Sequence, residues 1–133
     1  MAEIVYRGCA PQLGLTQVAS AGVWANAKPL PMDARARAAL ERRRYPVEKR
    51  WKSTLLTAPA LRGFDRVLAA DAKVMAGLQQ LWPDAPPRCL QLLMDLIPGR
   101  EGEDLPDPYY GSESDFEHAL DLIERSVRGF LTR

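Results

Sequence analysis

Two short apolar runs separated by an amphipathic helix constrain the fold of this chain more than any other feature. The run DRVLAAD, residues 65–71, reads as a buried strand, and RCLQLL, residues 88–93, reads as a second one. Between them, residues 72–82 place their apolar side chains on one helical face before the prolines at 83, 86 and 87 end the helix. A strand, a helix and a strand in this order predict a βαβ unit, and therefore an α/β fold with a parallel sheet.

The other predicted elements fit the same fold class. We expect a helix over residues 1–9, a short strand within LTQVASAG (15–22), a helix capped by Asp33 and a short helix within 46–63. After a long loop over residues 94–111, Ser114 and Glu117 form a predicted capping box for the last helix. The apolar residues of that helix recur at helical spacing and predict a core face: Phe116, Ala119, Leu120, Ile123, Val127, Phe130 and Leu131. The length of 133 residues predicts one domain, 1–133.

Composition excludes several classes of function. The 18 basic and 17 acidic residues give no support for a nucleic-acid or membrane partner, and no stretch is long and apolar enough to span a membrane. The basic run 42–44 is expected to be a solvated helix end, with a phosphate- or acid-binding face as the alternative. The N-terminus shows no signal peptide, and two cysteines, Cys9 and Cys89, are too few for a disulfide framework, so we expect a cytoplasmic protein.

Metal and nucleotide cofactors are not expected. His118 is the single histidine and has no cysteine near it in the sequence, so no metal site is predicted. Glycine-rich phosphate motifs of the nucleotide-binding kind are absent. Both cysteines have apolar neighbours and are expected to be packed in the core.

The stretch DLPDPYYGS, residues 104–112, is the candidate site. It holds Asp107 between two prolines and places Tyr109 and Tyr110 directly after it. A surface turn is one interpretation, because Asp-Pro starts turns and proline fixes φ. The other is a proton donor at the rim of a pocket, since the loop follows the last strand and open parallel sheets bind ligands at the carboxyl ends of their strands.

From residue 1 to the last helix, the chain resembles the low-molecular-weight protein tyrosine phosphatases. DLPDPYYG is similar to the acid loop of that family, D-[VIL]-P-D-P-Y-Y-G, and FDRVLAAD to its F-D-x-[IV]-L-A-M-D strand. SAG followed by MDARARAALERRRY resembles the S-A-G and [PD]-D-P-R-A stretches, and FEHALDLIE resembles the helix F-E-x-V-L-D-L-I-E. The four stretches occur in the family's order, so the resemblance implies its three-layer α/β fold.

The resemblance also implies roles for three residues of the loop. Asp107 would be the general acid that protonates the leaving tyrosine oxygen, and then the base when water attacks the phosphoenzyme. Tyr109 and Tyr110 would form an aromatic wall that stacks on the substrate phenol. The implied partner is a phosphotyrosine protein or an aryl phosphate. An aromatic residue after S-A-G often helps to choose the substrate in the family; here Asn26 stands at that position and Trp24 lies two places away.

The nucleophile of this chemistry is not found in the chain. The family uses C-x5-R-[ST], but six positions beyond Cys9 stands Leu15, and six beyond Cys89 stands Asp95. In many members the phosphate loop is followed directly by M-A-E, and this chain begins Met1-Ala2-Glu3. We therefore expect a truncated chain that starts after the phosphate loop and lacks the first strand, which is internal in the family sheet.

Two consequences are expected. Residues 65–70 and 88–93 should still pair in parallel, whereas residues 16–20 should be displaced, or the exposed strand edges should pair across a homodimer. The chain should be inactive by itself. A natural pseudophosphatase that binds without turnover is the alternative function. An arsenate reductase of the same fold ranks last, because it needs the same loop and further thiols.

Overall fold

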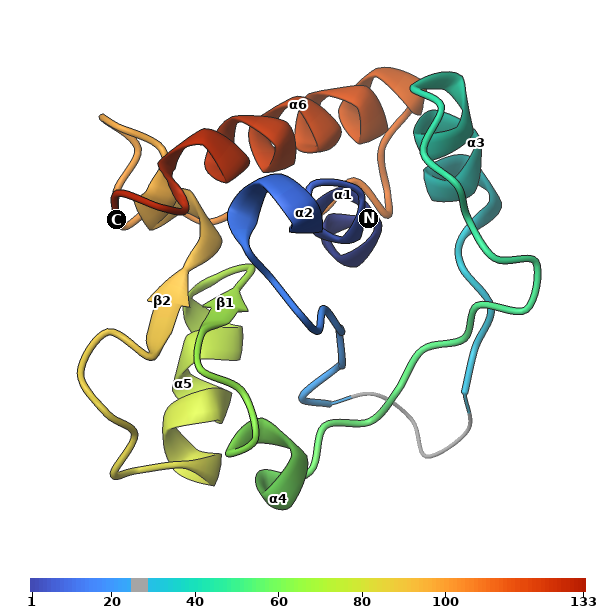
Figure 1. Cartoon of the computed structure of the whole chain (residues 1–133). Coiled ribbons are helices and arrows are strands. Elements are labelled where there is room, and N and C mark those ends of the chain that lie inside the picture. The colour runs from blue at the N-terminus through green and yellow to red at the C-terminus, as the bar shows by residue number, and fades with distance from the viewer. Residues whose placement is uncertain (25–28) are drawn as a thin grey trace.

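Strand β1 (Val67–Ala69), helix α5 (Ala72–Leu81) and strand β2 (Leu90–Leu92) form the predicted βαβ unit in the computed structural model, which describes residues 1–24 and 29–133 (Figure 1). The strands pair in parallel, with Val67 opposite Leu90 and Ala69 opposite Leu92. Helix α5 begins at the Asp71 cap, whose carboxylate accepts from Val74 N at 2.8 Å. The predicted parallel pairing is confirmed, although both strands are shorter than expected.

Helices cover both faces of this unit. Leu68 packs into a large core cluster with α1 (Ala2–Gly8) and α6 (Glu113–Gly129), whereas Val67 and Ala69 pack into a second cluster with α5. Neighbouring residues of a strand point to opposite faces, so β1 separates the two clusters. The short helix α2 (Ala10–Leu13) lies beside α1, and the short helix α4 (Ala58–Leu61) lies at the bottom of the molecule in the view of Figure 1. The predicted three-layer α/β fold is confirmed.

Helix α6 supplies much of the first cluster. Its buried side chains lie against α1, α3 (Ala34–Arg42) and the 3-10 helix η1 (Leu93–Leu96). We predicted a loop at η1, but its Leu93, Met94 and Leu96 are buried. Where α6 meets η1, Gly129 lies so close to the main chain that a Cβ there would overlap Leu96 O. Glycine at this position therefore permits the contact.

The start of α6 differs from the prediction. Ser112, and not Ser114, is its N-cap, and Ser112 N donates to Asp115 Oδ2 at 2.8 Å. The predicted partner, Glu117, instead binds Arg42 and Arg43. The predicted box was wrong because two acceptable Ser-x-x-acid pairs overlap here, and the arginines of α3 attract the acid of the second pair.

The strand predicted within residues 15–22 is also wrong. The segment contains no strand, and only Gly22 makes an isolated bridge, to Leu55. Side chains of α1 bind its backbone instead: Arg7 Nη2 donates to Val18 O at 2.9 Å, and Ser20 N donates to Glu3 Oε1 at 2.9 Å. Residues 16–20 pair with neither β1 nor β2, which form the sheet of the described residues.

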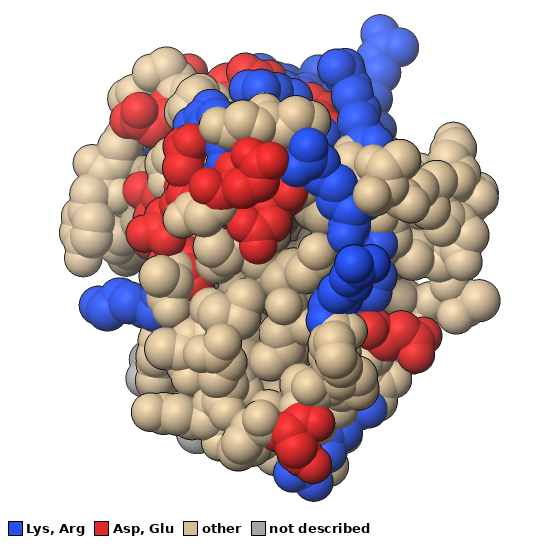
Figure 2. Space-filling view, turned by 90° about the vertical axis from the view of Figure 1, so that its left-hand side faces the viewer, with Lys and Arg blue, Asp and Glu red and all other residues tan. Residues whose placement is uncertain are grey.

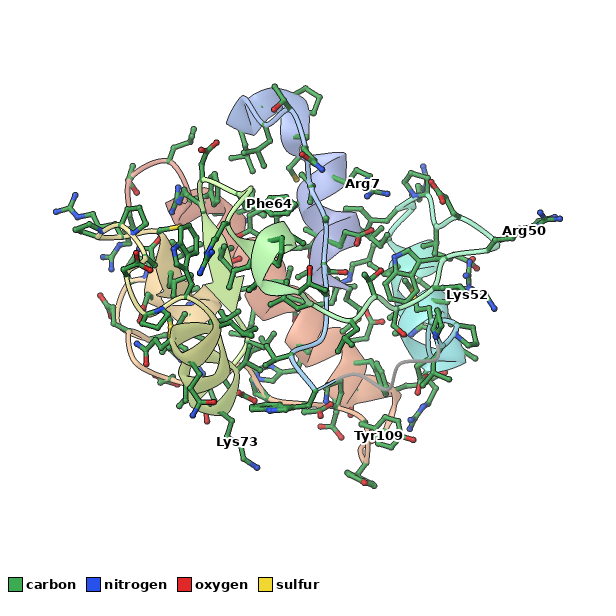
Figure 3. The ribbon with its side chains drawn as sticks, turned by 90° about the horizontal axis from the view of Figure 1, so that it is seen from below. Arg7, Arg50, Lys52, Phe64, Lys73 and Tyr109 are labelled. Carbon is green, nitrogen blue, oxygen red and sulfur yellow. The ribbon has the colours of Figure 1, made fainter. Side chains whose placement is uncertain are left out.

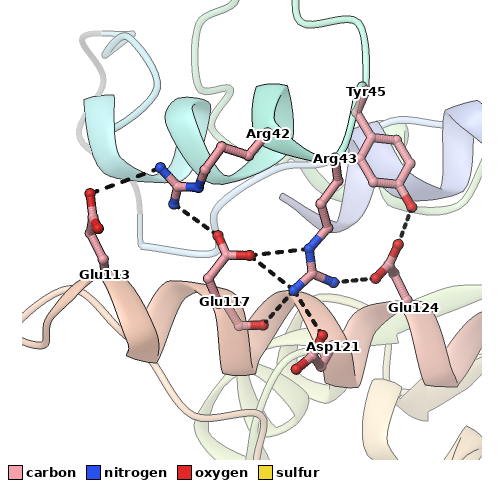
Figure 4. Close-up of polar contacts among 7 residues, drawn as sticks. All are labelled: Arg42, Arg43, Tyr45, Glu113, Glu117, Asp121 and Glu124. Carbon is pink, nitrogen blue, oxygen red and sulfur yellow. Dashed lines mark hydrogen bonds and ion pairs between the residues drawn. The ribbon is translucent and has the colours of Figure 1, made fainter.

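Arg42 and Arg43, at the end of α3, hold α6 through a series of ion pairs (Figure 4). Arg43 contacts Glu117 at 3.0 Å and Asp121 at 2.8 Å, and it also pairs with Glu124. The prediction of a solvated helix end was therefore wrong for Arg43, whereas Arg42 is exposed as predicted. The acids recur along one face of α6, so a single guanidinium can reach three of them.

Tyr45 extends the same contact. Its hydroxyl donates to Glu124 Oε2 at 2.5 Å. Burial, together with the neighbouring Glu124 carboxylate, raises the pKa of Tyr45, so the phenol stays protonated and remains a donor.

None of the helices among residues 1–24 and 29–133 has the length and apolarity needed to cross a membrane.

Replacing Arg43 by Met should lower the free energy of unfolding by about 1–3 kcal/mol, because the half-buried carboxylates of Glu117 and Glu124 would lose charge-assisted hydrogen bonds. Urea unfolding followed by circular dichroism measures this change. The matched control is Arg42→Met: the Arg42 side chain is 45% exposed, compared with 23% for Arg43. Exposed ion pairs contribute at most about 1 kcal/mol. Equal losses in the two variants would contradict the assignment.

Candidate active site

The loop that contains Asp107 is anchored at the carboxyl end of β1. Leu105 N donates to Ala70 O at 2.8 Å, directly after the strand. One residue earlier, Asp104 Oδ1 accepts from Ala72 N at 2.9 Å, in the first turn of α5. These two contacts place the loop at the edge of the sheet where the sequence predicted it.

Asp107 lies exposed at the tip of this loop. Its Oδ1 accepts from Tyr109 N at 3.0 Å, the side-chain turn that aspartate favours before proline. A second turn follows at once, because Gly111 N donates to Pro108 O at 2.8 Å. The predicted turn is thus present, and Oδ2 of Asp107 has no hydrogen-bond partner among the described residues.

Tyr109 and Tyr110 project from the loop with 58% and 95% of their surfaces exposed. Their ring centroids lie 4.9 Å apart with an interplanar angle of 85°, an edge-to-face pair. Figure 3 shows Tyr109 at the margin of the molecule. The two rings present a contiguous aromatic surface beside Asp107.

Arg35 holds the other end of the loop, and the sequence analysis assigned it no role. Its Nη2 donates to Tyr109 O at 2.8 Å and its Nη1 to Gly111 O at 3.1 Å. The guanidinium lies 4.7 Å from the centroid of the Phe116 ring, and it pairs with Asp33 at 3.1 Å. Arg35 stands within the MDARA stretch, but the two carbonyl groups that accept its hydrogen bonds are more than 70 residues away. No local pattern therefore predicts the contact with the loop.

Trp24 and Asn26 were the two candidates for a specificity residue. Trp24 is 65% exposed, and its ring lies on α5 at Gly77, where a Cβ would come within 3.3 Å of Trp24 Cζ2. It is therefore packed along one edge, on the helix whose first turn anchors the loop. Asn26 lies outside the described residues.

Neither cysteine is close to the loop in the sequence or bonded to it. Cys9 is half-buried between α1 and α2, and Cys89 is buried just before β2. Burial, with a smaller contribution from Asp65, raises the pKa of the Cys89 thiol. Because the thiolate is the nucleophilic form, this environment opposes reactivity. Within the described part of the chain, no group of three or more His, Cys, Asp and Glu residues could hold a metal ion.

Comparison with known proteins identifies the family. The family model described as low molecular weight phosphotyrosine protein phosphatase matches residues 1–133. A low molecular weight protein-tyrosine-phosphatase of Streptomyces coelicolor is 37% identical over 70 residues, which cover 50% of this chain and 43% of that protein. The match thus spans less than half the length of this curated relative.

Solved structures agree with this match. The low molecular weight phosphotyrosine phosphatase VcLMWPTP-2 of Vibrio cholerae superposes with a TM-score of 0.81 at 29% identity, over 96% of this chain and 82% of its own. Wzb of Vibrio vulnificus, in complex with benzylphosphonate, gives 0.81 at 28% identity, over 98% and 86%. On the family match along its whole length, this chain belongs to the low molecular weight phosphotyrosine protein phosphatase family.

Proposed function

We propose that this chain carries the proton-transfer half of a site that hydrolyses phosphotyrosine or another aryl phosphate. Asp107 is the general acid and base, and Tyr109 and Tyr110 flank the phenol ring of the substrate. The observation that carries the proposal is the fixed loop: Leu105 and Asp104 tie its start to β1 and α5, and Arg35 ties its end to α3. The aromatic phosphonate bound in the Vibrio vulnificus relative supports an aryl phosphate as the ligand class.

The chemistry explains why the loop must be fixed. A phenolate leaving group has a conjugate acid with a pKa of about 10, so protonation at the moment of bond cleavage lowers the barrier. The carboxyl group must lie within hydrogen-bond reach of the bridging oxygen, and it then accepts a proton from the attacking water. A misplacement of about 1 Å costs about 10²-fold in rate. Contacts at both ends of the loop restrict Asp107 in this way.

The proposal includes inactivity of the 133 residues alone. A thiolate must attack phosphorus, and backbone N–H groups with an arginine must hold the phosphate oxygens. No Cys-x5-Arg occurs in the sequence, and Cys89 is buried. The same absence supports a second candidate function, a binding module that holds a phosphorylated partner without turnover. Only the first function has a chemical need for Asp107.

The chain by itself should therefore not hydrolyse phenyl phosphate above the uncatalysed rate. Loss of a covalent nucleophile removes many powers of ten in rate. The measurement is phosphate release by the purified chain. Turnover that stays with the protein through successive columns would contradict the proposal.

Activity should appear when a first strand and a Cys-x5-Arg loop of the family pattern are joined ahead of Met1. In that enzyme, Asp107→Asn should lower kcat by about 10²–10⁴-fold on phenyl phosphate, the usual contribution of a general acid. The loss should shrink for leaving groups of low pKa, which need no proton. Glu103→Gln, which removes another acid of the same loop, is the control and should leave kcat unchanged. A normal rate for Asp107→Asn on phenyl phosphate would refute the role.

Arg35→Met should loosen the loop, because the carbonyls of Tyr109 and Gly111 would lose their donor. In the 133-residue chain, hydrogen exchange at the amides of residues 109 and 111 should accelerate by about tenfold or more. Arg37→Met is the matched control: Arg37 lies one half-turn away on α3 and donates to Glu48 O at 2.9 Å, in a different loop. Unchanged exchange in Arg35→Met, or equal changes in the two variants, would show that Arg35 does not hold the loop.

A further inference from the structure

A cavity opens at the edge of the sheet opposite the acid loop. Its volume is about 600 Å³, and its lining includes Asp65 and Arg66, just before β1, and Arg88 and Cys89, just before β2. The acid loop, in contrast, bonds to Ala70, just after β1. In Figure 3, Phe64 of the cavity and Tyr109 of the acid loop lie toward opposite sides of the molecule.

The cavity is strongly basic. Four arginines line it, and Asp65 is its only acidic side chain. Arg133 is paired with Glu101 at 2.6 Å, but Arg62, Arg66 and Arg88 have no ion pair among residues 1–24 and 29–133. Figure 2 faces the side of the molecule where β2 and the C-terminal end lie, and it shows Lys and Arg atoms from the upper right to the middle of this face, beside a cluster of Asp and Glu atoms.

Arg66 is half-buried and makes no ion pair with a carboxylate in the described part of the chain. Its Nη1 donates to Phe130 O and its Nη2 to Gln91 Oε1 at 2.9 Å, while the guanidinium stacks on the Phe130 ring at 3.8 Å. Burial lowers the pKa of Arg66, so the charged form is disfavoured by its surroundings. A guanidinium has five donors, so three remain for a ligand. An anion in the cavity would compensate the charge.

Arg88 adopts a backbone conformation that is unusual for its residue type. Its φ is +67°, and Cys89 N donates to Pro86 O at 3.1 Å, which closes a turn over residues 86–89. Pro87 fixes φ near −65°, so this is a type II turn, in which the third residue is normally glycine. Strained residues of this kind cluster at ligand-binding sites. Here the strained residue is one of the cationic side chains that line the cavity.

We propose that this cavity binds an organic phosphate that carries a flat aromatic group. Arg62, Arg66 and Arg88 bind the phosphoryl oxygens, since guanidinium donors match phosphate geometry. Trp82 and Phe64, both in the lining, provide the surface for the aromatic group. The site is separate from the acid loop and does not depend on the hydrolytic function.

Titration of the 133-residue chain with phenyl phosphate, followed by amide NMR, tests the proposal. The amide resonances of residues 62–66 and 86–91 should change their chemical shifts in a saturable way at ligand concentrations below about 10 mM, because we expect a dissociation constant in the millimolar range. Phenol and benzoate are the probes that lack the phosphoryl group, and each should bind at least tenfold more weakly. No saturable shift, shifts confined to residues 104–112, or equal binding of benzoate would overturn the proposal.

Two variants and one control identify the arginines. Arg62→Met and Arg88→Gly should each weaken phenyl phosphate by about tenfold, the effect of one charge-assisted hydrogen bond. Arg50→Met removes an arginine outside the cavity, labelled in Figure 3, and should bind as the unchanged chain does. Since glycine relieves the positive φ, Arg88→Gly should keep or raise the melting temperature, which separates lost binding from lost folding. Unchanged affinity in both cavity variants would refute the site.

Discussion

The burial of α6 against η1 is the contact on which the arrangement of the candidate site depends. Helix α6 follows the acid loop and η1 precedes it, and the closest approach between them is at the C-terminal end of α6, where Gly129 meets Leu96. Gly129 permits this approach, because any side chain there would overlap Leu96 O. Since β2 runs directly into η1, the same contact fixes α6 relative to the sheet. Helix α3, whose Arg35 binds the end of the acid loop, packs on α6 in turn.

The position of Asp107 results from three contacts that belong to different parts of the chain. Leu105 bonds to the end of β1, Asp104 to the first turn of α5, and Arg35 of α3 to the carbonyl of Tyr109. The tip between them is short and carries its own turn. Helix α3 is in turn held to α6 by Arg43 (Figure 4). The loop is thus fixed by the core, although its tip lies in solvent.

The sequence predicted the elements whose determinants are local. The βαβ unit follows from apolar periodicity and from prolines that end a helix, and α6 follows from its apolar face. The predictions that failed depended on distant partners. Residues 15–22 were predicted to contain a short strand, but Arg7 and Glu3 of α1 bind their backbone groups instead. The role of Arg35 in the candidate site was not predictable for the same reason: its carbonyl acceptors lie at the other end of the chain.

Near-neutral composition concealed an uneven distribution of charge. With 18 basic and 17 acidic residues, the composition gave no support for a nucleic-acid or membrane partner. In the folded chain, however, the acids of α6 are used by the arginines of α3, and Asp33 is used by Arg35. The arginines at the amino ends of β1 and β2 are left with one acid among them. Net charge is a sum over the whole chain, whereas an anion responds to charges within about one Debye length, roughly 8 Å at physiological salt. The excess of positive charge at this edge is therefore a property of the fold, and neither composition nor periodicity could predict it.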